Sequence, residues 1–202
     1  VKLKVVGFPH SSQDTETITC AETTLWACME YFGFKYPEYK PILPSHIINT
    51  LSKVSFERQL PSNGLNVLQI SAALKEFGFG SKIYSAEEYG NIFPLIFSTY
   101  IESGLPVISI LQKPNSYGHA FICIGREKII GQKIEAYTDT VILDNGISIC
   151  DLDGINKKFV FIDDNYPPYR FSDFTSPCEY YSNPDFRHYK IKYFVVPLYS
   201  KI

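Results

Sequence analysis

The chain has 202 residues, of which 45% are hydrophobic and 20% charged, and its formal net charge is −2 at pH 7. This length buries a core of ordinary domain size, and the composition excludes a disordered chain or a coiled coil. The lack of any Lys or Arg run excludes the electrostatic footprint of a nucleic-acid-binding protein. No stretch approaches the ~20 apolar residues that cross a bilayer, so we expect no membrane span in this chain.

The cysteines argue against a metal centre and against a disulfide framework. Their number is odd, their spacing is irregular, and neither a C-x-x-C pair nor a Cys/His cluster occurs among Cys20, Cys28, Cys123, Cys150 and Cys178. We therefore expect no metal and no cofactor. Unpaired cysteines fit a reducing compartment, so we expect a cytoplasmic protein. The first residues lack a starting Met and are too short and too charged for a secretory signal, which indicates a trimmed N-terminus.

The first elements in chain order are a predicted short strand and a polar loop, over residues 5–9 and 10–17. Thr19 and Glu22 then have the spacing of a capping box, in which each residue satisfies a backbone amide of the other. Apolar residues follow at helical intervals, at Leu25, Cys28, Met29 and Phe32. The pattern predicts a helix that begins at Cys20 and stops at Gly33.

Three further helices are predicted before residue 105. They cover residues 45–52, a segment after Asn63-Gly64 that ends at Gly78-Phe79-Gly80, and residues 94–103. The middle helix has Leu68, Ala72 and Phe77 among its apolar positions. A short strand is expected at 82–84.

After Gly104 the pattern changes to strands separated by turn signals. Strands are predicted over 105–111, 120–124, 134–142, 159–162 and 190–196. Helices followed by strands predict an α+β protein with an antiparallel sheet rather than alternating βαβ units. We expect a single domain over 1–202, with a helical part of about 1–104 and a sheet part of about 105–202.

Cys20 is the candidate nucleophile. The unsatisfied amides of a helix N-terminus favour the thiolate form of a cysteine placed there, although Glu22 on the same turn partly opposes this effect. The alternative is that Cys20 is simply a small apolar residue.

His119 is the candidate general base. It lies where a glycine-bearing loop passes into the apolar strand 120–124, a position that is rigidly held yet open to solvent. Gly118 before it allows a close approach by substrate or by the nucleophilic helix. The alternative is a histidine that merely ends a loop. The other three histidines lack such a context, and we expect His10, His46 and His188 at the surface.

An aspartate pair and a glutamine complete the candidate site. Asp163 and Asp164 follow the apolar strand 159–162, and a carboxylate there could orient an imidazole. Because side chains alternate along a strand, we expect only one of the two to face His119, although the same residues also suit a turn. The side-chain amide of Gln13 could donate to an oxyanion together with the backbone N–H of Cys20.

These motifs together resemble the papain-like cysteine peptidases. The resemblance is nearest to the bacterial peptidases that cleave bacteriocin leaders at a double glycine. It rests on Gln13, on the run Cys20-Ala21-Glu22-Thr23-Thr24-Leu25-Trp26, on Gly104-Leu105-Pro106-Val107-Ile108, on Gly118-His119-Ala120-Phe121-Ile122 and on Phe161-Ile162-Asp163. The family has its cysteine on a central helix and its histidine and aspartate on adjacent strands of a C-terminal antiparallel sheet.

The resemblance implies a role for each of four residues. Cys20 would be the nucleophile, His119 the base, Asp163 the orienting carboxylate and Gln13 the oxyanion donor, with Asp164 left as an alternative to Asp163. The gap between Gln13 and Cys20 is longer than is usual in the family. Residues 37–64 and the tail from Tyr166 onward have no counterpart, so the resemblance does not define the substrate groove.

The sequence therefore predicts a cysteine hydrolase that cleaves a peptide or isopeptide bond through a thioester acyl-enzyme. Two alternatives stay open: an acyltransferase or transglutaminase-like enzyme with the same triad, and a catalytically inactive peptide-binding module. The expected partner is a peptide or protein substrate, and the sequence does not define the oligomeric state.

Overall fold

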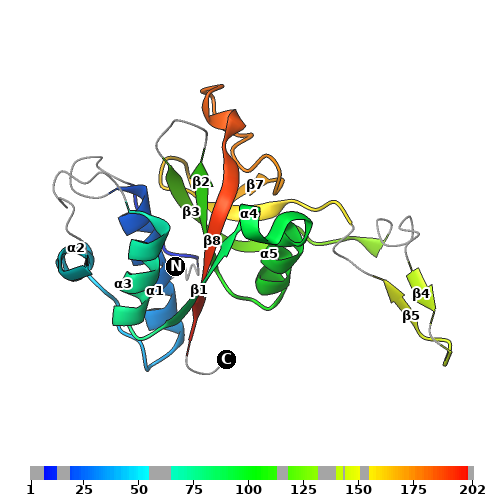
Figure 1. Ribbon diagram of the computed structural model, residues 1–202, viewed down its shortest axis with the longest axis horizontal. Helices are drawn as coiled ribbons and strands as arrows, with labels where there is room; N and C mark the ends of the chain where they lie inside the picture. Colours follow the sequence, from blue (N-terminus) through cyan, green and yellow to red (C-terminus); the bar gives the residue numbers. More distant parts are fainter. Residues whose placement is uncertain are drawn as a thin grey trace, which may run out of the picture.

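The protein consists of helices packed on both faces of an antiparallel sheet (Figure 1). The computed structural model describes residues 7–12, 19–54, 65–112, 118–131, 140–142, 144–150 and 155–199. The helical elements are α1 (Cys20–Lys35), α2 (Pro44–Val54), α3 (Val67–Glu76), α4 (Ala86–Tyr89), α5 (Phe93–Glu102) and the short 3-10 turns η1 (Gly90–Ile92) and η3 (Phe186–His188). The strands are β1 (Gly80–Ser85), β2 (Val107–Gln112), β3 (His119–Arg126), β4 (Thr140–Ile142), β5 (Ser148–Cys150), β6 (Phe159–Ile162), β7 (Arg170–Ser172) and β8 (Lys190–Leu198).

The main sheet has six strands in the order β1-β8-β2-β3-β6-β7, and every pairing in it is antiparallel. This arrangement confirms the α+β class predicted from the sequence. The last strand, β8, lies between the edge strand β1 and β2, so the C-terminal strand pairs with two strands from the middle of the chain. β3 pairs with β2 on one side and antiparallel with β6 on the other, which brings His119 at the start of β3 close to Asp163, which follows the end of β6.

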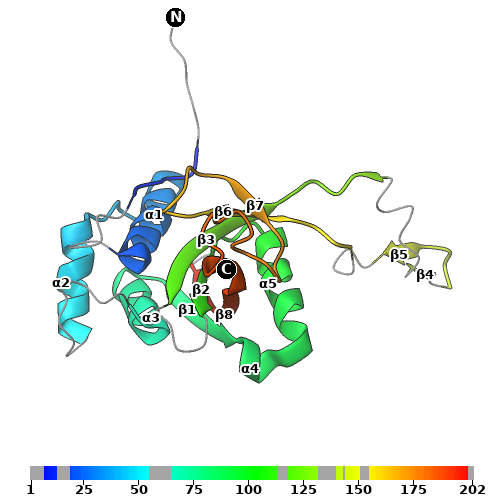
Figure 2. The ribbon, with the colours of Figure 1, turned by 90° about the horizontal axis from the view of Figure 1, so that it is seen from above.

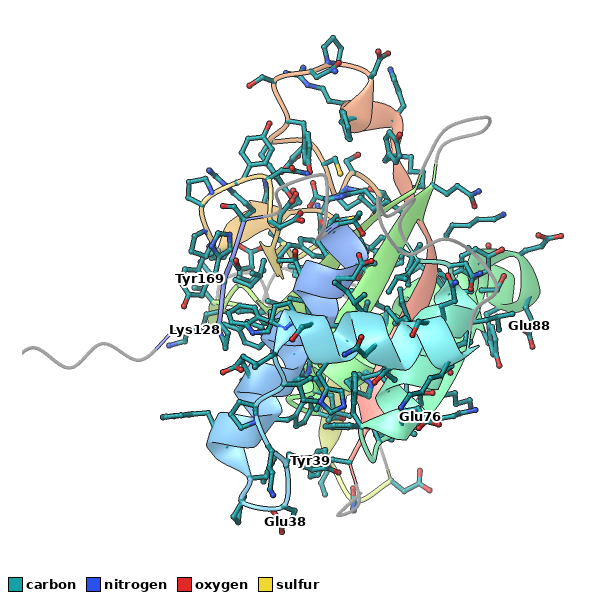
Figure 3. All side chains as sticks on the ribbon, turned by 90° about the vertical axis from the view of Figure 1, so that its left-hand side faces the viewer. Glu38, Tyr39, Glu76, Glu88, Lys128 and Tyr169 are labelled. Carbon is teal, nitrogen blue, oxygen red and sulfur yellow. The ribbon has the colours of Figure 1, made fainter. Side chains whose placement is uncertain are left out.

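Alternation along the strands divides the apolar core into two layers. Ala120 and Ile122 of β3 pack with α1, α2 and α3 on one face of the sheet, the face seen in Figure 3. Phe121 and Cys123 pack on the opposite face with α5 and with the segment between β7 and β8. Figure 2 shows α1 to α3 on one side of the sheet and α5 on the other. Both faces of β3 are therefore buried, which explains its unbroken apolar sequence.

Helix α1 begins where the sequence predicts but ends later. Thr19 and Glu22 form the capping box, with the Glu22 carboxylate accepting a hydrogen bond from the Thr19 backbone N–H at 3.3 Å. The predicted stop at Gly33 is wrong, because the helix continues to Lys35. A Cβ atom at Gly33 would lie 2.8 Å from the backbone nitrogen of Pro41. Gly33 thus permits the chain after the helix to cross closely over it.

The other helices and strands differ from the predicted ones in detail. In α3 the buried positions include Ile70, Ala73 and Leu74, whereas Leu68 is 68% exposed. The apolar face is therefore rotated from the predicted one, since the Asn66 cap places Leu68 in the first turn on the outside. The strand predicted over 82–84 is confirmed as part of the longer β1, whereas β7 was not predicted.

Two predicted strands do not appear as expected. Of the strand over 134–142, only β4 is described, and it pairs with β5 in a separate hairpin that projects from the main sheet (Figure 1). Of the strand over 5–9, residues 7–9 have no strand structure, and the rest lies outside the described residues. The Phe8 backbone N–H donates instead to the Tyr169 hydroxyl at 3.0 Å. Among the described residues, none of the helices combines the length and apolar character that crossing a bilayer requires.

Candidate active site

Cys20 occupies the first turn of α1 and faces the start of β3. Its Sγ accepts a hydrogen bond from the Ala120 backbone N–H at 3.3 Å. The Thr24 hydroxyl, one turn further along α1, donates to the Ala120 carbonyl at 3.3 Å. These two bonds fix the helix N-terminus against the strand.

The other cysteines have a different environment. Cys20 is half-buried, whereas Cys28, Cys123 and Cys178 are buried, and all four are free thiols. Burial raises the pKa of the Cys28 and Cys123 thiols well above the ordinary value and that of Cys178 to about 12. Buried neutral thiols are inert, so among the four cysteines whose side chains are described Cys20 is the one placed to react.

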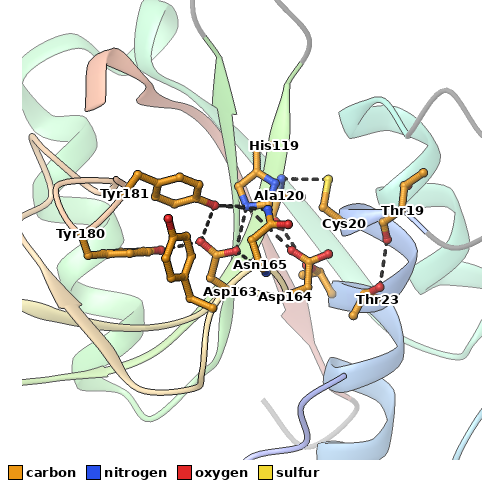
Figure 4. A network of polar contacts seen from close by, with 12 residues as sticks. Thr19, Cys20, Thr23, His119, Ala120, Asp163, Asp164, Asn165, Tyr180 and Tyr181 are labelled. Carbon is orange, nitrogen blue, oxygen red and sulfur yellow. Dashed lines mark hydrogen bonds and ion pairs between the residues drawn. The ribbon is translucent and has the colours of Figure 1, made fainter. Parts of the chain in front are cut away.

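His119 is the first residue of β3 and lies between Cys20 and a carboxylate (Figure 4). Its Nε2 lies 3.1 Å from Oδ1 of Asp163, and the ring is also hydrogen-bonded to the Cys20 side chain. Burial disfavours the charged imidazolium, but the hydrogen bonds and charges of Asp163 and Cys20 outweigh it. The pKa of His119 is therefore raised well above its ordinary value. The ring is only 6% exposed, less than its position at the start of a strand predicts.

Asp163 directly follows β6 and is fully buried. Its two oxygens accept four hydrogen bonds: Oδ1 from His119 Nε2 and from the Asn165 backbone N–H, and Oδ2 from the hydroxyls of Tyr180 and Tyr181, at 2.6 to 3.1 Å. Burial alone would raise the pKa of this carboxyl. The hydrogen bonds and the charge of His119 overcome that effect and lower it to about 2. Asp163 is therefore a fixed negative charge behind the imidazole.

Tyr180 and Tyr181 belong to the site but were not predicted from the sequence. The Tyr181 hydroxyl lies 2.7 Å from Oδ2 of Asp163 and 3.1 Å from Nε2 of His119, so it is within hydrogen-bonding distance of both residues. Both tyrosines come from the segment between β7 and β8, about 17 residues after Asp163 in the chain. The Tyr-rich composition of this tail was the only available signal, and it carries no information about which ring reaches the site.

Asp164 lies close to the same histidine but beyond hydrogen-bonding distance. Its Oδ1 is 3.9 Å from Nε2 of His119, against 3.1 Å for Asp163. Among the described residues, no group meets hydrogen-bond geometry with either of its oxygens. It lines a very small cavity beneath α1, with Thr23 and Thr24. Burial, reinforced by the charge of Asp163, raises the pKa of Asp164 to about 6 although the charge of His119 opposes the shift.

The three residues His119, Asp163 and Asp164 present ligand atoms within 4.8 Å of one another, the composition of a possible metal site. A carboxylate has about four lone-pair positions, and those of Asp163 are occupied by the four donors described above. Coordination would require at least one of these bonds to break. The arrangement therefore fits a proton-transfer network better than a cation site.

The remaining predicted residues have separate outcomes. Gln13 lies outside the described residues. His46 and His188 are exposed, as predicted. The prediction for His10 is wrong: it is half-buried, and its Nε2 lies 3.2 Å and 3.1 Å from the backbone carbonyls of Asp163 and Tyr166. His10 thus fastens the N-terminal segment to the turn that carries the two aspartates.

Two hollows meet at Cys20, Gly118 and His119. One, of about 420 Å³, continues between the start of α3 and the sheet and is lined by Leu65, Val67, Ile110, Leu111 and Tyr193. The other, of about 450 Å³, continues toward the segment between β7 and β8 and is lined by Tyr166, Tyr181, Phe186 and Tyr189. An extended chain lying over Sγ would therefore have room on both sides of the atom that it meets.

No family model and no curated protein matches the sequence. Among solved structures, the fold is similar to the peptidase domain of Streptococcus ComA, a bi-functional ABC transporter involved in a quorum-sensing pathway. The similarity has a TM-score of 0.55 and 12% sequence identity, and it covers 96% of this chain and 100% of that domain. At this low sequence identity, the similarity is evidence for a shared backbone fold. The protein therefore has the fold of the papain-like cysteine peptidases.

Proposed function

We propose that this protein is a cysteine hydrolase that cleaves a peptide or isopeptide bond. The single observation that carries the proposal is the connected series Cys20–His119–Asp163, in which one imidazole is hydrogen-bonded to a thiol on one side and to a buried carboxylate on the other. A similar order of groups activates the nucleophile in cysteine and serine hydrolases on several unrelated folds. The likeness to a peptidase domain supports the same conclusion from the backbone.

In the proposed reaction, the Cys20 sulfur attacks the carbonyl carbon of the scissile bond as His119 holds the thiol proton. A tetrahedral intermediate forms and collapses when His119 transfers that proton to the leaving amine. The product of this half-reaction is a thioester on Cys20. His119 then removes a proton from water, the hydroxide attacks the thioester, and the thiol is restored with release of the carboxylic acid.

The negative oxygen of the intermediate needs hydrogen-bond donors. The backbone N–H of Cys20 belongs to the first turn of α1, where amides have no partner within the helix. It is the donor that we assign to the oxyanion, with the helix dipole acting in the same direction. Gln13 remains a predicted second donor.

The proposed role of Asp163 is to hold His119 in the tautomer that presents Nδ1 to the thiol. Oδ1 of Asp163 accepts from Nε2–H, which leaves Nδ1 for Cys20. Asp163 is preferred to Asp164 because it alone of the two lies within hydrogen-bonding distance of the ring.

The test is hydrolysis of a broad pool of unstructured peptides, with products identified by mass spectrometry. We expect the unsubstituted chain to cleave a subset of the pool and Cys20→Ala to lose turnover by several orders of magnitude while keeping its fold. Cys28→Ala is not a suitable control because that residue is in the core, so Cys20→Ser serves as a conservative comparison. Full activity in Cys20→Ala would overturn the assignment.

The same assay separates the two alternative functions. Addition of a primary amine to the reaction shows whether the thioester passes to an amine, which would give an amide product and indicate an acyltransferase. Binding of peptides without any new product, by a chain whose Cys20 is intact, would indicate a peptide-binding module. We expect free acid and free amine products in water.

A further inference from the structure

The hollow between Cys20 and the segment joining β7 to β8 has the properties of a side-chain binding pocket. We call it the aromatic hollow, and its walls are Tyr166, Tyr181, Phe186 and Tyr189. Figure 1 shows the segment between β7 and β8, which supplies most of these residues, near the upper ends of β2 and β3. A group held here lies directly beside the thiol.

We propose that the aromatic hollow selects a bulky uncharged side chain, aromatic or large aliphatic, on the substrate residue next to the scissile bond. The inference rests on the proposed hydrolase function and adds the substrate class to it. The hollow shares Cys20, Gly118 and His119 with the site of attack, so its occupant is adjacent to the attacked carbonyl.

The chemistry of the walls favours such an occupant. Four aromatic rings line the hollow, and among its described lining residues His119 is the only one with a basic side chain. No Lys, Arg, Asp or Glu side chain is among them, so a charged occupant would lose hydration without gaining an ion pair. An apolar ring placed among four others gains burial and edge-to-face contacts.

The walls are also rigid before any substrate binds. Phe186 stacks on Tyr181 with ring centroids 4.8 Å apart and on Tyr189 at 5.2 Å, each with an interplanar angle of 15°. Tyr166 meets Tyr181 at 4.6 Å, nearly edge to face, with an interplanar angle of 66°. Arg187 Nε donates to the Tyr181 carbonyl at 3.0 Å. A pre-ordered pocket loses little entropy on binding, which favours selectivity.

One wall residue and one rim residue can be changed without removing a hydrogen-bond partner of His119 or Asp163. Phe186 is half-buried and has no polar contact with His119 or Asp163. Asn183 is exposed at the rim, where its Oδ1 accepts from the Asp185 backbone N–H at 2.9 Å. Aspartate at 183 keeps that acceptor but adds a negative charge to an uncharged pocket.

The experiment compares kcat/KM for matched peptides that differ only in the residues flanking the cleaved bond. For Phe186→Ala we expect about tenfold loss or more with an aromatic or large aliphatic residue at the selected position, and little change with Ala there. Phe171→Ala is the matched control, because Phe171 is 51% exposed on β7 and does not line the hollow. For Asn183→Asp we expect improved cleavage of peptides with Lys or Arg at the same position.

The possible outcomes distinguish failure of the pocket assignment from failure of the hydrolase assignment. Cleavage without side-chain preference on either side of the bond, or equal losses for every peptide in Phe186→Ala, overturns the pocket and leaves the hydrolase standing. If Phe186→Ala does not fold, an unchanged preference in Asn183→Asp has the same meaning. If the unsubstituted chain cleaves no peptide at all, the hydrolase assignment fails, and the pocket assignment fails with it.

Discussion

At the scale of single residues, two adjacent carboxylates next to one imidazole have opposite properties. Asp163 accepts four hydrogen bonds and has its pKa lowered to about 2, whereas Asp164 is buried beside it with its pKa raised to about 6. The difference arises from donors: the backbone turn and two tyrosine hydroxyls are directed at Asp163. The environment of each carboxyl, and not the residue type, therefore determines its pKa.

Substitution of each aspartate by asparagine should therefore have unequal effects on activity. In Asp163→Asn the side chain can present an N–H to Nε2, which favours the wrong imidazole tautomer, so we expect kcat to fall by about 10²–10⁴-fold. In Asp164→Asn we expect kcat within about tenfold of the unsubstituted value. Steady-state kinetics on the best peptide checks both. A larger loss in Asp164→Asn would reverse the assignment.

At the scale of elements, the junction of α1 with β3 positions the nucleophile, and the packing of α1 supports that junction. Gly33 allows the loop at Pro41 to cross the last turns of the helix. Because the obstacle is backbone, Gly33→Ala should destabilise the protein by about 1–3 kcal/mol, although alanine is the better helix former. Urea unfolding measures the change.

A second glycine gives the matched control for this prediction. A Cβ atom at Gly125 of β3 would meet nothing within 4 Å, so we expect Gly125→Ala to change the free energy of unfolding by no more than about 0.5 kcal/mol. Stabilisation by Gly33→Ala would show that helix propensity dominates and that the close approach to Pro41 is not important.

How far the sequence predicts these elements depends on whether the signal is local. The capping box at Thr19, the apolar run after His119 and the end of the strand before Asp163 are local signals, and they placed three site residues correctly in their elements. The contacts of Tyr180 and Tyr181 with Asp163 depend on how a long irregular segment folds back over the sheet. No periodicity encodes such a return, so these residues could not be predicted.

The same limit explains the errors elsewhere. Gly33 suits a helix stop by local criteria, but its role is to avoid the distant Pro41 backbone. His10 has a polar local context, yet its ring contacts carbonyls more than 150 residues away in the chain. Pairing of β1 with β8 also joins segments that are remote in sequence.

At the scale of the whole molecule, the buried site makes stability depend on pH. The folded pKa of His119 is raised, so its contribution is fully present below pH ~6.5 and is lost as pH rises through the folded value. The folded pKa of Asp163 is lowered, so its contribution is present above pH ~4 and is lost as pH falls toward about 2. These two groups together stabilise the fold most between about pH 4 and 6.5.

Asp164 lowers the free energy of unfolding at higher pH, and substitution of this residue should remove that effect. Its raised pKa means that the folded state favours the neutral acid, and this stabilisation is lost as pH rises through about 6. Asp164→Asn should therefore increase the free energy of unfolding at pH 8 by about 1–3 kcal/mol, and by much less at pH 4. Urea unfolding at both pH values tests this. An equal effect at the two pH values would contradict the raised pKa.

The location and the domain organisation remain predictions from the sequence: a cytoplasmic protein with one domain over residues 1–202.

The coupling of Cys20 to His119 is measured most directly by the rate at which iodoacetamide alkylates each cysteine at pH 6. In the unsubstituted chain we expect fast labelling of Cys20 and negligible labelling of Cys28, Cys123 and Cys178. In His119→Ala we expect the Cys20 rate to fall by about tenfold or more, since the proposed general base that is hydrogen-bonded to the sulfur has been removed. An unchanged Cys20 rate in a folded His119→Ala variant would show that the two side chains do not act as a pair.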